Sequence, residues 1–310
     1  MRRAQRLARP HRRTAVNAPH PLLTATHEVA NQVPVLSGHN LYASDAALRD
    51  AVARDGAADS VAWLAARGAE LGSTRMQQWA EQANRVAPTL RVFDPTGRRL
   101  DTVEFHPAYH ELMAYLKRHG AAAGPWADPV PGAHVRRAAL YVMFAQVEDG
   151  TLCPTTMTYA CVPPLARDAA LAPQWLPRIF SPEYDPRFLP AGQKTGVTLG
   201  MGMTEKQGGS DVRTNTTRAE PACGRAWRIV GHKWFLSAPM CDAFLILAQA
   251  PAGPSCFLLP RFQPDGSVND IRIQRLKDKL GTARTRVPRS SSGTRTGSSS
   301  ARKDEASRRS

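Results

Sequence analysis

No stretch of the 310-residue sequence approaches the roughly 18 consecutive apolar residues that a membrane helix needs, so we expect no transmembrane segment. The sequence also lacks a phosphate loop, because the glycines between 200 and 209 fit neither GxxxxGK(S/T) nor GxGxxG followed by a helix. Its five cysteines contain no CxxC pair, and the two nearest, Cys153 and Cys161, lie eight positions apart. We therefore expect no metal site, and free buried thiols in the cytoplasm.

Acidic residues are absent from residues 1–25, which carry six arginines, and scarce in residues 282–310, where eight basic residues accompany two acids. Each end thus holds +6 of the net charge of +15, which leaves +3 for residues 26–281. A pI near 10.3 invites a nucleic-acid interpretation. Charge confined to two ends favours solvated tails instead. We expect residues 1–26 to be a basic disordered extension and residues 282–310 to be a disordered Arg/Ser-rich tail.

The first part of the chain has the apolar spacing of helices. Residues 108–119 repeat apolar side chains at i, i+3, i+4 and i+7. The stretch GPWADPVPG predicts a loop because of its glycines and prolines. We predict an all-α domain over residues 27–190. The further predicted helices are 46–56, 60–72, 74–85 and 134–148.

Short strands separated by turns follow from residue 191 onward. Because these strands do not alternate with helices, they predict a small antiparallel barrel or sandwich and exclude a doubly wound dinucleotide domain. This middle β domain is expected to span residues 191–281, and the fold class is therefore α+β. The predicted strands are 195–203, 215–220, 226–235, 243–250, 255–262 and 271–276.

The most informative segment is LGMGMTEKQGGSDVRTNTT at residues 199–217. A strand carries two methionines and then Thr204, and a Gly208–Gly209 turn precedes Ser210. Glycines let backbone amides approach a planar or anionic ligand, and the two hydroxyls can form hydrogen bonds. Taken alone, a strand followed by a glycine turn is the simpler interpretation.

A second segment, WRIVGHKWFLS at residues 227–237, predicts a strand, a turn at residues 231–233 and a returning strand. Trp234 and Phe235 could stack on a flat polar ring, and the Ser237 hydroxyl could bond its edge. Taken alone, a tryptophan that fills the core is the simpler interpretation. The histidine and lysine in the turn are expected to be solvated.

Together, MGMTEKQGGSD and the later GHKWFLS resemble the flavin-binding β domain of the acyl-CoA dehydrogenase superfamily. In that family, T-E-x-x-x-G-S-D and G-x-K-x-(W/F)-(I/S/T)-(S/T) segments form two arms around the isoalloxazine ring. Other stretches resemble its adaptive-response branch, the flavoproteins that bacteria induce upon alkylation damage to DNA. The resemblance covers roughly residues 27–281. These stretches are NLYASDAALRDAV, RRLDTVEFHPAYHELM, QVEDGTLCPTTMTYA, LPAGQKTGVTLGMGMTEKQGGSD and RLKDKLG.

The resemblance implies that FAD is the cofactor, with the protein placing the substrate against the ring. Thr204 and Ser210 would contact the ring and the pyrophosphate, and Phe235 to Ser237 would approach from the other arm, with Trp234 beside them. The residues implied to line the cofactor are Met201, Gly202, Met203, Thr204, Glu205, Lys206, Gln207, Gly208, Gly209, Ser210, Trp234, Phe235, Leu236 and Ser237.

The family reaction takes a proton from the acyl α-carbon and a hydride from the β-carbon, giving a trans-enoyl thioester, so an acyl-CoA-like substrate is implied. In the family, a glutamate base lies in a C-terminal helical domain that nothing after Gly281 resembles. The catalytic residues are therefore unknown, and Glu205 belongs to the flavin motif rather than serving as the base. The same domain supplies the family's oligomer contacts and, in the adaptive-response branch, the proposed DNA surface. The final strand of the β domain, which would follow residues 279–281, is also expected to be lost, and its loss would leave an exposed sheet edge.

Three functional hypotheses remain open from the sequence. The chain is an acyl-CoA dehydrogenase-like oxidoreductase by descent, a DNA-associated protective flavoprotein with incidental dehydrogenase activity, or an inactive fragment whose behaviour differs from both. The abrupt Arg, Ser, Thr and Gly bias after Gly281 is what a change of reading frame would give, and an intact frame across codons 279–283 would refute that idea.

Overall fold

The computed structural model of the protein describes residues 30–56, 59–277, 288–292 and 297–299. Residues 37–310 belong to one unit, and residues 30–36 belong to another, in which they form neither helix nor strand. Among the described residues, no helix is long and apolar enough to cross a bilayer. The predicted N-terminal extension lies outside the described residues.

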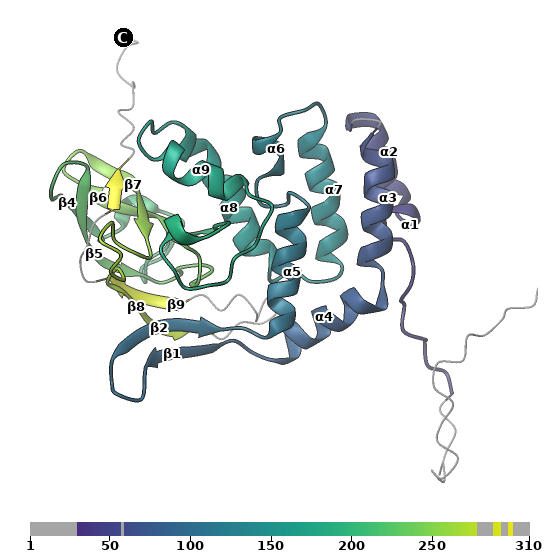
Figure 1. Ribbon diagram of the computed structural model, residues 1–310, viewed down its shortest axis with the longest axis horizontal. Coiled ribbons are helices and arrows are strands. Elements are labelled where there is room, and N and C mark those ends of the chain that lie inside the picture. The colour runs from purple at the N-terminus through teal and green to yellow at the C-terminus, as the bar shows by residue number, and fades with distance from the viewer. Residues whose placement is uncertain (1–29, 57–58, 278–287, 293–296, 300–310) are drawn as a thin grey trace, which may run out of the picture. The chain divides into compact units, whose positions relative to one another are not determined.

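Helices fill most of the described chain between residues 41 and 180 (Figure 1). All five predicted helices are present, and polar caps fix some of their starts: the Asp45 side chain accepts from Leu48 N at 2.9 Å, and Ser73 accepts from Met76 N at 3.3 Å. The predicted loop GPWADPVPG contains the one-turn helix α6. The helices are α1 (Leu41–Ser44), α2 (Ala46–Asp55), α3 (Ser60–Leu71), α4 (Thr74–Arg85), α5 (Pro107–Arg118), α6 (Gly124–Ala127), α7 (Ala133–Ala145), α8 (Leu152–Ala166) and α9 (Ala172–Phe180).

The prediction of an all-α N-terminal domain is wrong in one element, an antiparallel hairpin of β1 (Thr89–Phe93) and β2 (Arg99–Glu104). The Asp94 carboxylate accepts from Thr96 N at 2.8 Å and Arg98 N at 2.9 Å, which stabilises the turn between the strands. Most side chains of the hairpin are exposed or half-buried, so the apolar pattern of the sequence does not reveal it.

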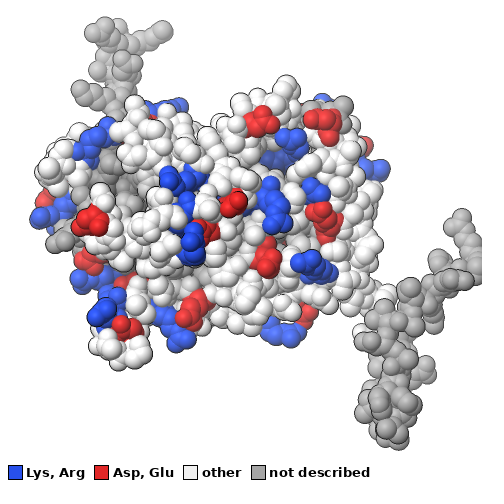
Figure 2. Space-filling view, in the orientation of Figure 1, with Lys and Arg blue, Asp and Glu red and all other residues white. Residues whose placement is uncertain are grey.

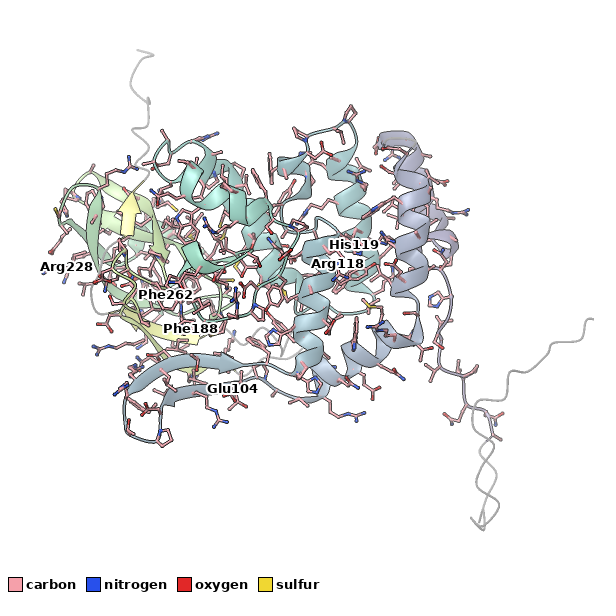
Figure 3. All side chains as sticks on the ribbon, viewed as in Figure 1. Glu104, Arg118, His119, Phe188, Arg228 and Phe262 are labelled. Carbon is pink, nitrogen blue, oxygen red and sulfur yellow. The ribbon has the colours of Figure 1, made fainter. Side chains whose placement is uncertain are left out.

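The hairpin is held by contacts with the middle domain that are distant in sequence. The buried Arg261 donates to Asp101 O at 3.0 Å, and the Asp101 carboxylate accepts from Ile273 N at 2.8 Å. The Arg261 guanidinium also lies over the ring of Phe188, 4.9 Å from its centroid, and Phe188 packs 4.8 Å from Phe262 (Figure 3). Tertiary contacts of this kind override the local pattern.

All six predicted strands are present in the middle domain. Their pairing is mainly antiparallel, as predicted, but β3 runs parallel to β6, from Leu199 opposite Ala243 to Gly202 opposite Ile246. The connection between β3 and β6 contains β4 and β5 and is therefore long enough for the crossover of a dozen or more residues that parallel neighbours need. The strands are β3 (Leu199–Gly202), β4 (Arg218–Pro221), β5 (Ala226–Lys233), β6 (Ala243–Ala250), β7 (Gly253–Pro260) and β8 (Ile271–Leu276).

Two short strands, β9 (Pro288–Ser292) and β10 (Gly297–Ser299), lie in the stretch predicted to be disordered, and the structure differs from the prediction there. β9 pairs antiparallel with both β5 and β8, and β10 pairs with β5 and β7. The edge of β8 that was expected to be exposed is therefore paired. Backbone hydrogen bonds of this kind need no apolar side chains, so a polar composition does not exclude them. The rest of the predicted tail lies outside the described residues.

Helix α8 joins the helical region to the start of β3. The Thr158 hydroxyl accepts from Leu199 N at 2.9 Å, and Cys161 packs with Leu199 and Ala243 in one buried cluster. The amine of Lys117, from α5, donates to Val197 O at 3.3 Å just before the strand. The segment that leads into the most informative motif is thus fixed from the helical side.

Candidate functional site

The two segments singled out by the sequence lie side by side. The first leaves β3 at Gly202 and continues to Ser210, and the second leaves β5 at Lys233 and continues to Ser237. Two backbone hydrogen bonds join them: Trp234 N donates to Thr204 O, and Ser237 N donates to Met201 O, each at 2.9 Å. The structure therefore brings together two motifs that are about thirty residues apart in sequence.

Glycine is required at Gly200 for this close approach. A Cβ atom on that residue would lie 2.4 Å from Ser237 O and 2.7 Å from the ring of Phe244. In the turn that follows β3, Gly208 N donates to Glu205 O at 3.1 Å, and Gly208 has a φ of 132°, which favours glycine. A Cβ on Gly209 would lie 2.7 Å from the Thr204 hydroxyl, so this turn packs closely against the threonine.

Six side chains of the paired segments are half-buried and chemically suited to a flat ligand with a polar edge. Met201, Met203, Thr204, Trp234, Phe235 and Ser237 are all intermediate in burial. They offer thioethers, two aromatic rings and two hydroxyls, and such groups can stack on a ring and bond its polar edge. Lys206 to Ser210 are exposed, although Lys206 N donates to His232 Nε2 at 3.2 Å and Gly208 N donates within the turn.

Two of the implied cofactor residues point their side chains into the protein instead. Glu205 has no exposed surface, and Leu236 is 1% exposed. The Glu205 carboxylate accepts from Thr216 N at 2.7 Å, from Thr217 N at 3.1 Å and from Gln207 Nε2 at 2.9 Å. It also forms an ion pair of 2.8 Å with Lys233 Nζ. Glu205 therefore links the first segment both to the end of β5 and to the residues that lead into β4.

The expectation that Lys233 is solvated in a turn is wrong, because β5 continues without a turn through Lys233, which is 4% exposed. Gly231 lies inside the strand and allows Thr217 to approach closely, since a Cβ on Gly231 would lie 2.4 Å from the Thr217 hydroxyl. Because side chains alternate along a strand, Lys233 lies on the same face as the buried Ile229. This alternation is the sequence feature that could have predicted the burial of Lys233.

The Glu205–Lys233 pair carries charge inside the protein. Burial by itself raises the pKa of Glu205, but hydrogen bonds, led by the one from Lys233, outweigh burial and hold the pKa well below its usual value. Burial lowers the pKa of Lys233, and the Glu205 charge opposes that effect. A carboxylate held as an anion by this many donors is a positioning group rather than a proton acceptor.

Comparison with known proteins agrees with the geometry. A family model described as "Adaptive response protein AidB N-terminal domain" matches residues 31–186, and one described as "Acyl-CoA dehydrogenase, middle domain" matches residues 200–290. The chain belongs to the AidB branch of the acyl-CoA dehydrogenase superfamily. The resemblance drawn from the sequence motifs is thus confirmed, as is the order of a helical region followed by a sheet-containing middle domain.

The chain is similar to AidB of Escherichia coli (strain K12), with 50% identity over 258 residues that cover 83% of this chain and 48% of that protein. It is 29% identical over 228 residues to acyl-CoA dehydrogenase family member 11 of Caenorhabditis elegans, covering 68% of this chain and 36% of that protein. The chain therefore spans about half the length of these relatives, or less.

Among solved structures, the crystal structure of Caenorhabditis elegans ACDH-11 in complex with C11-CoA matches with a TM-score of 0.74 and 25% identity, covering 92% of this chain and 50% of that one. A glutaryl-CoA dehydrogenase from Mycobacterium smegmatis in complex with FADH2 matches with a TM-score of 0.50 and 18% identity, covering 82% and 54%. The second match bears on the fold alone.

Proposed function

We propose that this chain provides the flavin-contacting part of an FAD-dependent acyl-CoA dehydrogenase-type oxidoreductase. The observation that carries the proposal is the pairing of the segment Met201–Ser210 with the segment Trp234–Ser237, tied beneath their surface by the Glu205–Lys233 pair. Membership in the acyl-CoA dehydrogenase superfamily supports this cofactor, and the half-buried thioether, aromatic and hydroxyl groups of the two segments suit a flat ring with a polar edge.

The residues of this chain would hold the ring, and bound FAD supplies the hydride acceptor. Met201, Met203 and Phe235 would contact the ring, while the Thr204 and Ser237 hydroxyls would bond its polar edge. The exposed turn from Gly209 to Ser210 would approach the phosphates. Each of these assignments is part of the proposal.

The substrate we propose is an acyl thioester of coenzyme A. It is supported by family membership and by the similarity to ACDH-11, which was solved with C11-CoA. Glu205 cannot serve as the base while its carboxylate is buried and engaged by Lys233 and backbone amides. The proton acceptor is therefore expected outside the two segments.

Anaerobic mixing of the FAD-loaded chain with straight-chain acyl-CoAs of different lengths tests this function. Bleaching of the flavin absorbance with recovery of the enoyl-CoA supports dehydrogenation by the chain itself. A shifted flavin spectrum without bleaching supports acyl-CoA binding and assigns the base to protein outside this chain. A flavin spectrum that no acyl-CoA changes would overturn the substrate assignment.

The alternative of a DNA-associated flavoprotein rests on the family branch alone. On the face drawn in Figure 2, lysine and arginine side chains are interspersed with acidic ones over the described residues. Such a mixture does not form the basic stripe of a nucleic-acid-binding face. The dehydrogenase-type function is therefore the one that the geometry supports.

A further inference from the structure

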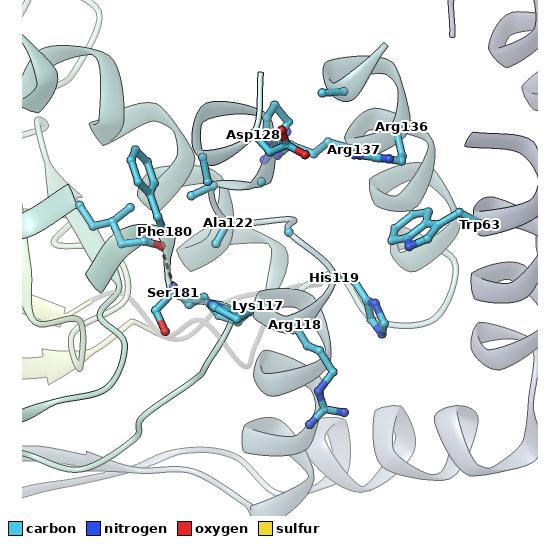
Figure 4. Close-up of a pocket in the computed structure, with 18 residues that line it drawn as sticks. Trp63, Lys117, Arg118, His119, Ala122, Asp128, Arg136, Arg137, Phe180 and Ser181 are labelled. Atoms are coloured by element: carbon cyan, nitrogen blue, oxygen red, sulfur yellow. Dashed lines mark hydrogen bonds between the residues drawn. The ribbon is translucent and has the colours of Figure 1, made fainter. Parts of the chain in front are cut away.

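A cavity of about 310 Å³ lies in the helical region, between the end of α5, helix α6, the start of α7 and the end of α9 (Figure 4). None of its 18 lining residues belongs to the two segments of the candidate flavin site. Its volume is at the lower end of the range for small-molecule sites, about 300–1,000 Å³. The cavity is therefore large enough for a ligand and separate from the flavin-contacting surface.

The lining is rich in positive charge. Lys117, Arg118, Arg136 and Arg137 all contribute to it, and Asp128 is its single acidic residue. Within the described part of the chain, no carboxylate lies within 4.0 Å of any of these four basic groups. With four basic residues and one acidic residue, the lining has an excess of positive charge.

Arg137 carries the most specific signal in the cavity. Its Nε donates to Ala121 O at 2.6 Å, and its guanidinium lies 3.7 Å from the ring centroid of Tyr159. These contacts fix the plane of the group, while its Nη2 atom is buried and has no hydrogen-bond partner. An unsatisfied buried donor in a native protein calls for an explanation, and a bound acceptor would provide one.

Arg136 is held in a similar way, with its guanidinium carbon 5.7 Å from the centroid of Trp63. In Figure 4, Arg136 and Arg137 lie on one side of the cavity, with Lys117 and His119 on the opposite side. Two planar guanidinium groups can present paired N–H donors to the oxygens of a phosphate. The two arginines thus concentrate positive charge on one wall of the cavity, and the buried Lys117 adds charge from the other side.

Two other features agree with an anionic ligand. Ala133, the first residue of the 13-residue helix α7, lines the cavity; its own amide donates to Val130 O at 3.1 Å, and the positive end of the helix dipole lies at this wall. Burial lowers the pKa of His119 to about 4, and the charges of Arg67 and Arg118 act in the same direction, against Glu70.

We propose that this cavity binds a small phosphate or diphosphate anion, with Arg136 and Arg137 as the principal ligands. The anion would accept from the Arg136 and Arg137 guanidinium groups that line the cavity, and Lys117 would contribute charge from beneath the cavity floor, where its amine donates to Ile179 O at 2.9 Å. This site is independent of the flavin and of the acyl-CoA chemistry proposed above.

Isothermal titration of the full 310-residue chain with inorganic pyrophosphate, at physiological ionic strength, tests the proposal. Saturable 1:1 binding is expected. Arg136→Gln should weaken it about tenfold or more, because it removes a charged pair of donors that lies over the Trp63 ring at the cavity wall. Arg137→Lys keeps the charge and loses the planar fork, so it should weaken binding as well.

Arg49→Gln is the matched control, because it removes the same charge from an exposed residue of α2 that lines no cavity described above. It should leave binding unchanged. Equal weakening by Arg49→Gln and Arg136→Gln would show that only the general positive charge attracts the anion, and would overturn the site. Absence of saturable binding of both phosphate and pyrophosphate would overturn it too.

Two further measurements define the ligand. Titration with adenosine diphosphate distinguishes a nucleotide, which would bind more tightly than pyrophosphate, from recognition of the diphosphate alone, and either result supports the site. The NMR titration midpoint of His119 should rise from about 4 when pyrophosphate is added. An unchanged midpoint at saturating pyrophosphate would contradict binding in this cavity.

Discussion

Replacing Glu205 by glutamine is expected to destabilise the protein strongly, although the side chain keeps its shape. Glu205 has no exposed surface, and the Lys233 side chain with which it pairs at 2.8 Å is 5% exposed. Removing one partner of a buried, hydrogen-bonded ion pair costs about 3–5 kcal/mol, because the other charge is left without compensation. That loss is a large part of the roughly 5–15 kcal/mol by which a domain is stable.

Urea denaturation followed by circular dichroism measures the effect as a fall in the midpoint at an unchanged slope. Lys233→Met should cost a similar amount, and the double variant should cost clearly less than the sum, since the two residues interact directly. Glu81→Gln, which breaks the exposed pair of Glu81 with Arg85 on helix α4, is the matched control and should have little effect.

The same pair predicts a pH dependence. Because the pKa of Glu205 is lower in the folded than in the unfolded chain, its contribution is complete above the unfolded pKa and is lost as the pH falls through the folded one. Glu205→Gln should remove that part of the acid sensitivity. The reasoning would be refuted if both single variants lost less than about 1 kcal/mol, or if their effects were additive.

Three other predictions follow from the structure. Gly231→Ala should destabilise the protein by about 1–3 kcal/mol through the clash with the threonine opposite it, whereas Gly192→Ala, which has open space around it, should not, as urea denaturation will show. Because burial lowers the pKa of His119 to about 4, the unfolded chain takes up the proton first. Stability should therefore fall between pH 6.5 and 4, by less than about 2 kcal/mol after solvent screening, and His119→Gln should flatten that slope. Duplex DNA binding, measured against salt, should vanish when the arginines and the lysine of residues 1–25 and 282–310 are replaced by glutamine, which leaves the chain of β9 and β10 in place; binding that survives would favour the DNA-associated alternative.

The sequence predicts the described fold well in segments whose apolar residues recur at a single spacing, either that of a helix or that of a strand. Helix α4 has the predicted bounds, and its apolar face is that of Met76, Ala80 and Ala83, all buried. The hairpin of β1 and β2 was missed because Arg261 and Ile273, far along the chain, hold it in place. No local signal contains such contacts, so propensity alone could not reveal it.

The sequence singles out the two candidate segments, but it does not show how they are connected in space. The motifs identify Met201 to Ser210 and Trp234 to Ser237, and these segments do pair. The buried link beneath them was misjudged, because a polar pair that follows a glycine, as His232 and Lys233 follow Gly231, is typical of an exposed turn. Only the alternation of β5, which places Lys233 on the face of Ile229, indicates that it is buried, and only the three-dimensional structure shows that Glu205 is its partner.

The central claim, that the paired segments bind the flavin ring, is tested most directly by titrating the 310-residue chain with FAD and following the flavin spectrum. We expect near-stoichiometric binding with a perturbed flavin absorbance. Phe235→Ala should weaken it about tenfold or more without unfolding the chain, and Phe93→Ala, at an exposed phenylalanine of the hairpin, should leave it unchanged. A folded chain that binds no FAD, or that binds it equally well in the wild type and in Phe235→Ala, would contradict the claim.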